Sequence, residues 1–222
     1  MLITISNVLD ADHLALVGGL LASTKWQDGG ATAGRVARQV KRNQQAILSE
    51  TVGPKIEQIL SDAVTKNAVL KAAAQPSRFS PLLVSKTGAG GGYGLHVDNP
   101  FMGQGTDRLR TDISFTLFLS PPEAYEGGEL VIEHAGQTLS LKPQAGDLVL
   151  YPSTSLHEVA EVTSGERLVC VGWIESRVRR ADDREILFDL NTLKAELGQS
   201  FPEQSPELLT LSKVIANLKR RF

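Results

Sequence analysis

The chain has 222 residues, with 23 Lys and Arg against 25 Asp and Glu, a formal net charge of -2 and one cysteine. The balanced charge offers no basic surface for generic nucleic-acid binding, and one cysteine excludes both an intramolecular disulfide and a cysteine-rich zinc site. No apolar run reaches the roughly 18 residues of a membrane span. A secretory signal needs a basic start, and no Lys or Arg occurs before Lys25. We therefore expect a cytoplasmic protein with no membrane partner.

The first 77 residues are predicted to form a helical segment that packs on the core (1–77). Asp10 is placed to cap a helix that runs to about Leu21. Apolar residues at helical spacing indicate a second helix over 49–74, and Pro54 fits its first turn, where a missing N–H costs little. The stretch between these helices is rich in turn residues.

The central segment, 78–177, is predicted to form strands. Its clearest run, 112–119, places four apolar side chains on one face. Turn-forming Gly, Pro, Asp and Ser separate the runs, and many short strands at this spacing indicate a jelly roll. The predicted fold is therefore mainly β with flanking α-helices. The further predicted strands are 79–85, 129–133, 137–141, 147–151, 157–162 and 166–174.

The last segment, 178–222, returns to helical spacing. Ser205 followed by Pro206 is a typical helix start, because Ser caps the first turn and Pro is tolerated there. Apolar residues then recur every three or four positions as far as Phe222. We expect a C-terminal helical extension whose amphipathic last helix offers a surface for a homo-oligomer.

Two histidines and one carboxylate are candidates for a metal site. His96 and Asp98 are two positions apart, so an extended chain points both side chains the same way. His157 begins a predicted strand and is the best third ligand, whereas His134 lies in a predicted turn and His13 in a helix. Two His and one carboxylate leave three octahedral positions open, as in Fe(II) oxygenases. The alternative interpretation of the His-x-Asp spacing is an ordinary polar turn.

Arg167 follows His157 by ten positions. If 163–165 form a three-residue hairpin loop with Gly in the left-handed position, Arg167 and His157 share one face of the hairpin. An arginine near a metal is suited to grip a carboxylate with two parallel hydrogen bonds. The alternative is a surface ion pair between Arg167 and Glu161.

Several linked blocks resemble the bacterial PKHD-type hydroxylases, a group of Fe(II)/2-oxoglutarate-dependent dioxygenases related to prolyl 4-hydroxylases. His96, Asp98, His157 and Arg167 match the H-x-D…H…R signature of these enzymes. The resemblance covers essentially the whole chain, including the helical tail. The matching blocks are 26–29, 32–34, 40–45, 92–99, 110–114, 125–130 and 151–157.

The resemblance implies a double-stranded β-helix, with Fe(II) held by His96, Asp98 and His157 and the far carboxylate of 2-oxoglutarate held by Arg167. Thr87 stands where related hydroxylases often carry a Tyr that helps to hold 2-oxoglutarate. The implied cofactors are Fe(II), 2-oxoglutarate as cosubstrate, O2, and L-ascorbate as reductant. Some members are named iron-uptake factors, which implies a loose link to iron homeostasis.

Three further residues lie close to the implied ligands in sequence. Tyr93 and Asn99 are expected to support the ligands, and Asp112 is expected either to contact substrate or to pair with Arg108 or Arg110. The expected reaction hydroxylates an unidentified acceptor, either a peptidyl Pro- or Lys-like side chain or a small molecule, and converts 2-oxoglutarate to succinate. The alternative is a non-catalytic binding protein that responds to iron, oxygen or 2-oxoglutarate.

Overall fold

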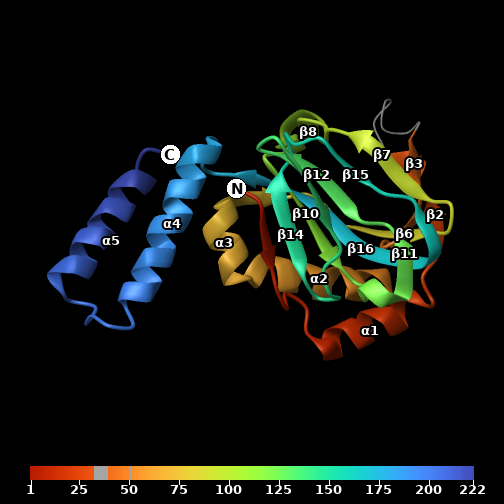
Figure 1. Ribbon diagram of the computed structural model, residues 1–222, viewed down its shortest axis with the longest axis horizontal. Coiled ribbons are helices and arrows are strands. Elements are labelled where there is room, and N and C mark those ends of the chain that lie inside the picture. The colour runs from red at the N-terminus through yellow and green to blue at the C-terminus, as the bar shows by residue number, and fades with distance from the viewer. Residues whose placement is uncertain (33–39, 51) are drawn as a thin grey trace.

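The computed structural model describes residues 1–32, 40–50 and 52–222 (Figure 1). Two antiparallel β-sheets face each other, three helices lie along the larger sheet, and two C-terminal helices extend to one side. This arrangement is a jelly roll, so the predicted fold class is confirmed. Residues 33 and 34 of the family-like block 32–34 lie outside the described residues.

The larger sheet carries most of the strands. Its order is β1 (Ile3–Ile5), β14 (Leu148–Pro152), β10 (Ile113–Phe118), β16 (Val162–Ser176), β6 (Leu83–Gly88), β4 (Gln44–Ala46) and β2 (Trp26–Asp28), with β5 (Pro76–Phe79) and β11 (Tyr125–Gly127) also paired to β16. The smaller sheet has the order β13 (Gln137–Leu141), β12 (Leu130–His134), β15 (His157–Val159), β7 (Gly92–His96) and β3 (Lys41–Arg42). A short ribbon joins β8 (Phe101–Met102) to β9 (Leu109–Arg110).

The described residues of the N-terminal segment form three α-helices rather than two. They are α1 (Ala11–Leu21), α2 (Gly53–Lys66) and α3 (Ala68–Ala74). The Asp10 cap is confirmed, because its side chain accepts a hydrogen bond from the His13 N–H at 2.9 Å. The single helix predicted over 49–74 is wrong: Asn67 is extended, ends α2, and caps α3 by accepting from Leu70 N–H. Side-chain capping thus overrides a continuous apolar pattern.

Among the described residues of the N-terminal segment, four strands were missed by the sequence pattern, and the strand predicted just after this segment has the wrong bounds. The missed strands β1 to β4 have only two or three residues each, too few to show an alternation of apolar and polar side chains. The strand predicted at 79–85 is wrong, because the chain leaves the sheet between β5 and β6. There the Ser80 side chain replaces a ladder partner by accepting a hydrogen bond from Trp173 N–H.

Strand β10 divides the molecule into two apolar layers. Ile113, Phe115 and Leu117 face α1 to α3 and are buried in the larger core, as the 112–119 pattern predicts. The alternate residues face the other sheet, where Phe118 joins a second apolar cluster around Leu130 and Tyr151. The polar residues on this inner face therefore lie between the two sheets, where a cavity opens.

The C-terminal helices are α4 (Ala181–Leu197) and α5 (Pro206–Lys219), which project from the jelly roll (Figure 1). The Ser205 cap is confirmed by its bond from Leu208 N–H. Leu208 and Ile215 of α5 are buried, and Ile215 packs in a cluster with Leu187 of α4. Part of the apolar surface of α5 is thus used within the chain, whereas Leu209 and Val214 stay exposed. No helix in the described part of the chain is long and apolar enough to cross a membrane.

Candidate metal and cosubstrate site

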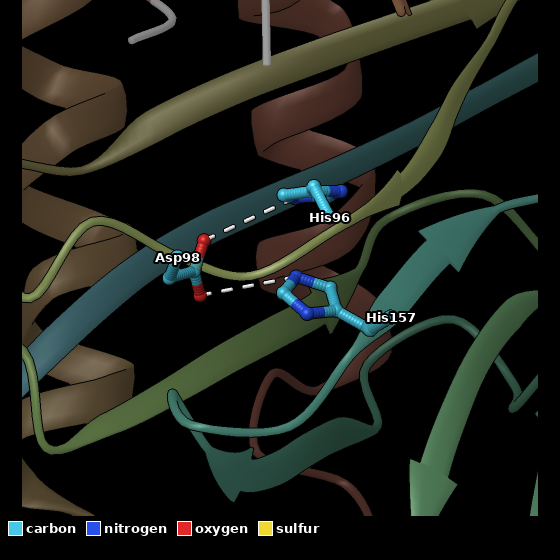
Figure 2. A group of neighbouring side chains, drawn as sticks. All are labelled: His96, Asp98 and His157. Atoms are coloured by element: carbon cyan, nitrogen blue, oxygen red, sulfur yellow. Dashed lines mark ion pairs between the residues drawn. The ribbon is translucent and has the colours of Figure 1, made fainter. Parts of the chain in front are cut away.

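The two sheets enclose a cavity of about 310 Å³, and the predicted metal residues meet in its wall. His96 ends β7, and His157 begins β15 directly opposite it in the sheet register. Asp98 follows β7, and its two carboxylate oxygens lie 4.0 Å from His96 Nε2 and 3.8 Å from His157 Nε2 (Figure 2). One ligand atom from each residue lies within 4.8 Å of the others, so a single ion can contact all three.

Both imidazoles present the correct nitrogen to this point. His96 Nδ1 lies 2.8 Å from the Gly94 carbonyl oxygen, and His157 Nδ1 lies 3.1 Å from that of Ser155. A carbonyl only accepts, so each Nδ1 carries the proton and each Nε2 keeps its lone pair for a metal. Burial and the neighbouring His157 lower the pKa of His96 to about 4, so its imidazole is neutral near pH 7.

A chain of two buried hydroxyls orients the carboxylate. Ser114 Oγ on β10 donates to Asp98 Oδ2 at 2.5 Å, and Ser153 Oγ lies 2.7 Å from Ser114 Oγ. Because an ionised carboxylate only accepts, the Ser114 proton is committed to Asp98 and Ser153 must donate to Ser114. This engages Oδ2 and leaves Oδ1 for an ion. Neither serine was predicted from the sequence, although Ser114 lies on the inner face of its strand.

Ser114→Ala is expected to weaken metal binding by about 10- to 100-fold, because a carboxylate ligand without its hydrogen-bond partner is poorly oriented. The measurement is Mn(II) titration followed by electron paramagnetic resonance. Ser120→Ala is the matched control, since Ser120 is equally buried but accepts from Leu168 N–H instead. An unchanged Mn(II) affinity in Ser114→Ala would show that Asp98 needs no such support.

Arg167 reaches the same cavity by a route that the sequence did not predict. The hairpin predicted at 163–165 is wrong, because those residues continue β16 and Gly165 pairs with Tyr125 of β11. Arg167 pairs with Thr87 in the larger sheet, whereas His157 lies in the smaller one. The two side chains therefore face each other across the cavity. They share one site, as expected, but from two opposed sheets and not from one hairpin.

The surroundings of Arg167 suit a carboxylate ligand. Its side chain is 2% exposed, and Nε and Nη2 have no hydrogen-bond partner among the described residues. Burial lowers the pKa of this guanidinium, which means that the surrounding side chains do not fully compensate the charge for its lost hydration. The alternative surface pair is wrong, because Glu161 is exposed and lies 3.4 Å from Arg42. Unpartnered donors in a cavity predict a ligand that accepts from them.

The donor set fits Fe(II) and 2-oxoglutarate together. Two imidazoles and one carboxylate on one side of an ion match the facial arrangement of non-haem Fe(II) oxygenases. Arg167 supplies a guanidinium across the same cavity for a second, distant carboxylate. Thr87 is buried beside Arg167 and lines the cavity, as its assignment to the cosubstrate requires.

The remaining predicted residues divide into two groups. The first group is Tyr93 and Asn99, which both line the cavity. The Tyr93 ring stacks on His96 with ring centroids 3.7 Å apart, and burial raises the pKa of the Tyr93 hydroxyl to about 12. Asn99 is exposed. Asp112 forms the second group, because it pairs with Arg110, one of the two expected roles. Its carboxylate lies 2.7 Å from Arg110 Nε and accepts a hydrogen bond from Ser176 N–H. It therefore anchors strand ends.

The other two histidines lie apart from the metal residues. His134 ends β12 at a tight turn, opposite Gln137, as predicted. His13 is exposed on α1, and its ring nitrogen lies 2.7 Å from Asp10. Lys41 and Asn43 also line the cavity, and neither was predicted from the sequence. The only signal for them was the family-like block 40–45, which carries no periodicity.

Comparison with known proteins agrees with this geometry. Residues 82–175 match the sequence profile described as the 2OG-Fe(II) oxygenase superfamily. A PKHD-type hydroxylase of Hyphomonas neptunium is 55% identical over 221 residues, which cover 100% of this chain and 99% of that protein.

Two solved structures show the same fold at low sequence identity. A prolyl hydroxylase from Trichoplax adhaerens, in complex with a hypoxia inducible factor oxygen degradation domain peptide fragment, has a TM-score of 0.58 at 19% identity, covering 84% of this chain and 86% of that chain. HygX from Streptomyces hygroscopicus, with nickel, 2-oxoglutarate and hygromycin B bound, has a TM-score of 0.55 at 13% identity, covering 79% and 83%. The full-length relative and the profile match show that the chain belongs to the PKHD-type hydroxylases of the 2OG-Fe(II) oxygenase superfamily and is a 2-oxoglutarate-dependent dioxygenase.

Proposed function

We propose that the enzyme hydroxylates a C–H bond of an acceptor, with Fe(II) bound by His96, Asp98 and His157 and 2-oxoglutarate bound by Arg167. The observation that carries the proposal is the buried guanidinium of Arg167. Two of its donor nitrogens have no partner in the described part of the chain, and it lies in the cavity that holds the three metal residues. When bound, iron and 2-oxoglutarate supply the activation of O2, and 2-oxoglutarate leaves as succinate and CO2.

The side chains of the protein perform binding and positioning in this proposal. The two imidazoles and the oriented Asp98 carboxylate hold the ion on one side and leave its other side open to the cavity. Arg167 fixes the far end of the cosubstrate, with Thr87 beside it. The buried apolar residues Leu130 and Val169 line the same cavity and exclude water from the reacting atoms.

The acceptor is proposed to be either a peptidyl Pro- or Lys-like side chain or a small molecule. Of the two similar structures, one is in complex with a peptide fragment and the other has hygromycin B bound. L-Ascorbate as reductant, a link to iron homeostasis, a cytoplasmic location and self-association through the C-terminal helices complete the proposal. They rest on the family resemblance and on the sequence alone.

The test is a mass-resolved search of cell extract for a product heavier by one oxygen atom that appears only with Fe(II) and 2-oxoglutarate together. We expect such a product with the wild type and none with Asp98→Ala. If extract never stimulates succinate formation and no oxygenated product appears, the enzyme does not hydroxylate a component of that extract. Tight 2-oxoglutarate binding in that case supports the alternative of a responsive binding protein.

A further inference from the structure

The phenol of Tyr125 is a buried polar group to which the proposed function gives no role. Tyr125 is 3% exposed, and its Oη has no hydrogen-bond partner among the described residues. Nε and Nη2 of Arg167 are in the same condition. A buried hydroxyl without a partner costs free energy, so we expect it to bond to a group that a ligand brings.

Tyr125 and Thr87 flank Arg167 from opposite edges of β16. Thr87 on β6 pairs directly with Arg167, and the turn that follows β6 stays hydrogen-bonded to the same edge. Strand β11 occupies the other edge, where Tyr125 pairs with Gly165, two positions before Arg167. The arginine that is proposed to hold the cosubstrate therefore has a hydroxyl-bearing side chain on each side.

Gly128 brings the Tyr125 ring against the stem of Arg167. A Cβ atom at position 128 would lie 3.0 Å from Tyr125 Cε2 and 3.1 Å from Arg167 Cδ, so both side chains pack closely on the Cα of this glycine. Cε2 adjoins the ring carbon that bears Oη, and Cδ is bonded to Nε, so the unpartnered hydroxyl and the unpartnered edge of the guanidinium are neighbours. Burial lowers the pKa of Arg167, and Tyr125 acts in the opposite direction because a nearby hydroxyl oxygen favours the charged form.

A carboxylate is the ligand that can bond to all three of these atoms at once. Its two oxygens only accept and offer about four lone-pair sites, enough for two guanidinium N–H groups and one phenol O–H. Burial raises the pKa of Tyr125, so its hydroxyl keeps the proton that it would donate. We propose that Tyr125 donates a hydrogen bond to the far carboxylate of 2-oxoglutarate, beside the pair of bonds from Arg167. This inference rests on the proposed function, because it takes that carboxylate to be the ligand of Arg167.

The competing role for Tyr125 is packing alone, in which its ring supports Arg167 and its hydroxyl contributes nothing. Tyr125→Phe separates the two roles, because it keeps the ring and removes only the hydroxyl. The test is calorimetric titration with 2-oxoglutarate in the presence of Mn(II). We expect Tyr125→Phe to weaken 2-oxoglutarate binding at least about tenfold and to leave Mn(II) affinity unchanged. Added to Arg167→Ala, it should weaken binding by a further factor of about three or more, since the phenol bonds to the carboxylate itself.

Ser120→Ala is the matched control. Ser120 is buried, and its hydroxyl bonds to the backbone of residues 166 and 168, on either side of Arg167. Its loss disturbs the same stretch of β16 and removes no proposed ligand contact, so 2-oxoglutarate affinity should not change.

An unchanged 2-oxoglutarate affinity in Tyr125→Phe, an equal loss in Ser120→Ala, or no further loss in the double variant would overturn the assignment. The last result would show that the hydroxyl acts only through Arg167. Failure of the proposed function is separately visible, because the wild type would then not bind 2-oxoglutarate, or Arg167→Ala would bind it as tightly as the wild type does.

Discussion

Arg167→Ala is expected to weaken 2-oxoglutarate binding by about 10- to 150-fold. A charge-assisted pair is worth roughly 1.5–3 kcal/mol, and about 1.4 kcal/mol corresponds to a factor of ten. The side chain is 2% exposed, so water does not screen this interaction. Arg167→Lys should recover only part of the affinity, because an ammonium lacks the planar fork of a guanidinium. The measurement is titration with 2-oxoglutarate in the presence of Mn(II).

Metal affinity should hardly change in Arg167→Ala, because Arg167 lies across the cavity from His96, Asp98 and His157. Arg42→Ala is the control, since that arginine is exposed and pairs with Glu161. Its loss should cost at most about 1 kcal/mol of stability and leave 2-oxoglutarate binding intact. An unchanged 2-oxoglutarate affinity in Arg167→Ala would contradict the carboxylate role, and with it much of the case for this cosubstrate site.

Replacing His96, Asp98 or His157 with Ala should each abolish Fe(II)-dependent turnover of 2-oxoglutarate while leaving the fold intact. Each change removes one of three proposed ligands, and two remaining donors do not hold the ion in its open facial arrangement. The metal residues lie on the cavity wall, outside the two main apolar clusters, so their loss does not disrupt the core. Succinate formation measures the loss, and circular dichroism checks the fold.

His134→Ala serves as the internal control for these variants. His134 lies at a turn of the smaller sheet, so its removal should leave turnover near that of the wild type. Full activity in His157→Ala would contradict the proposal that His157 is a ligand. An inactive His134→Ala protein that is still folded would contradict the proposal that His134 has no role in turnover. Normal Mn(II) affinity in Asp98→Ala would likewise remove the carboxylate from the proposed ligand set.

The sequence predicted helix caps and the facing of side chains along one strand, because these depend on residues a few positions apart. Asp10 and Ser205 cap their helices because a short polar side chain reaches the N–H three residues ahead. The alternation over 112–119 correctly identified the buried helix-facing side of β10. The two-residue separation of His96 and Asp98 likewise predicted that both face one point. The predicted strand start at His157 indicated the third ligand, and the family-like blocks then supported both His157 and Arg167.

The sequence by itself determined which residue types carry the chemistry and the class of fold around them. Only the tertiary structure decided how the strands pair, because alternation assigns each side chain to a face and says nothing about the neighbouring strand. Arg167 faces His157 across two sheets, where a hairpin was expected. Ser114 reaches Asp98 in the same way, from 16 positions away in the sequence. Such contacts join segments that only the packing of the two sheets brings together.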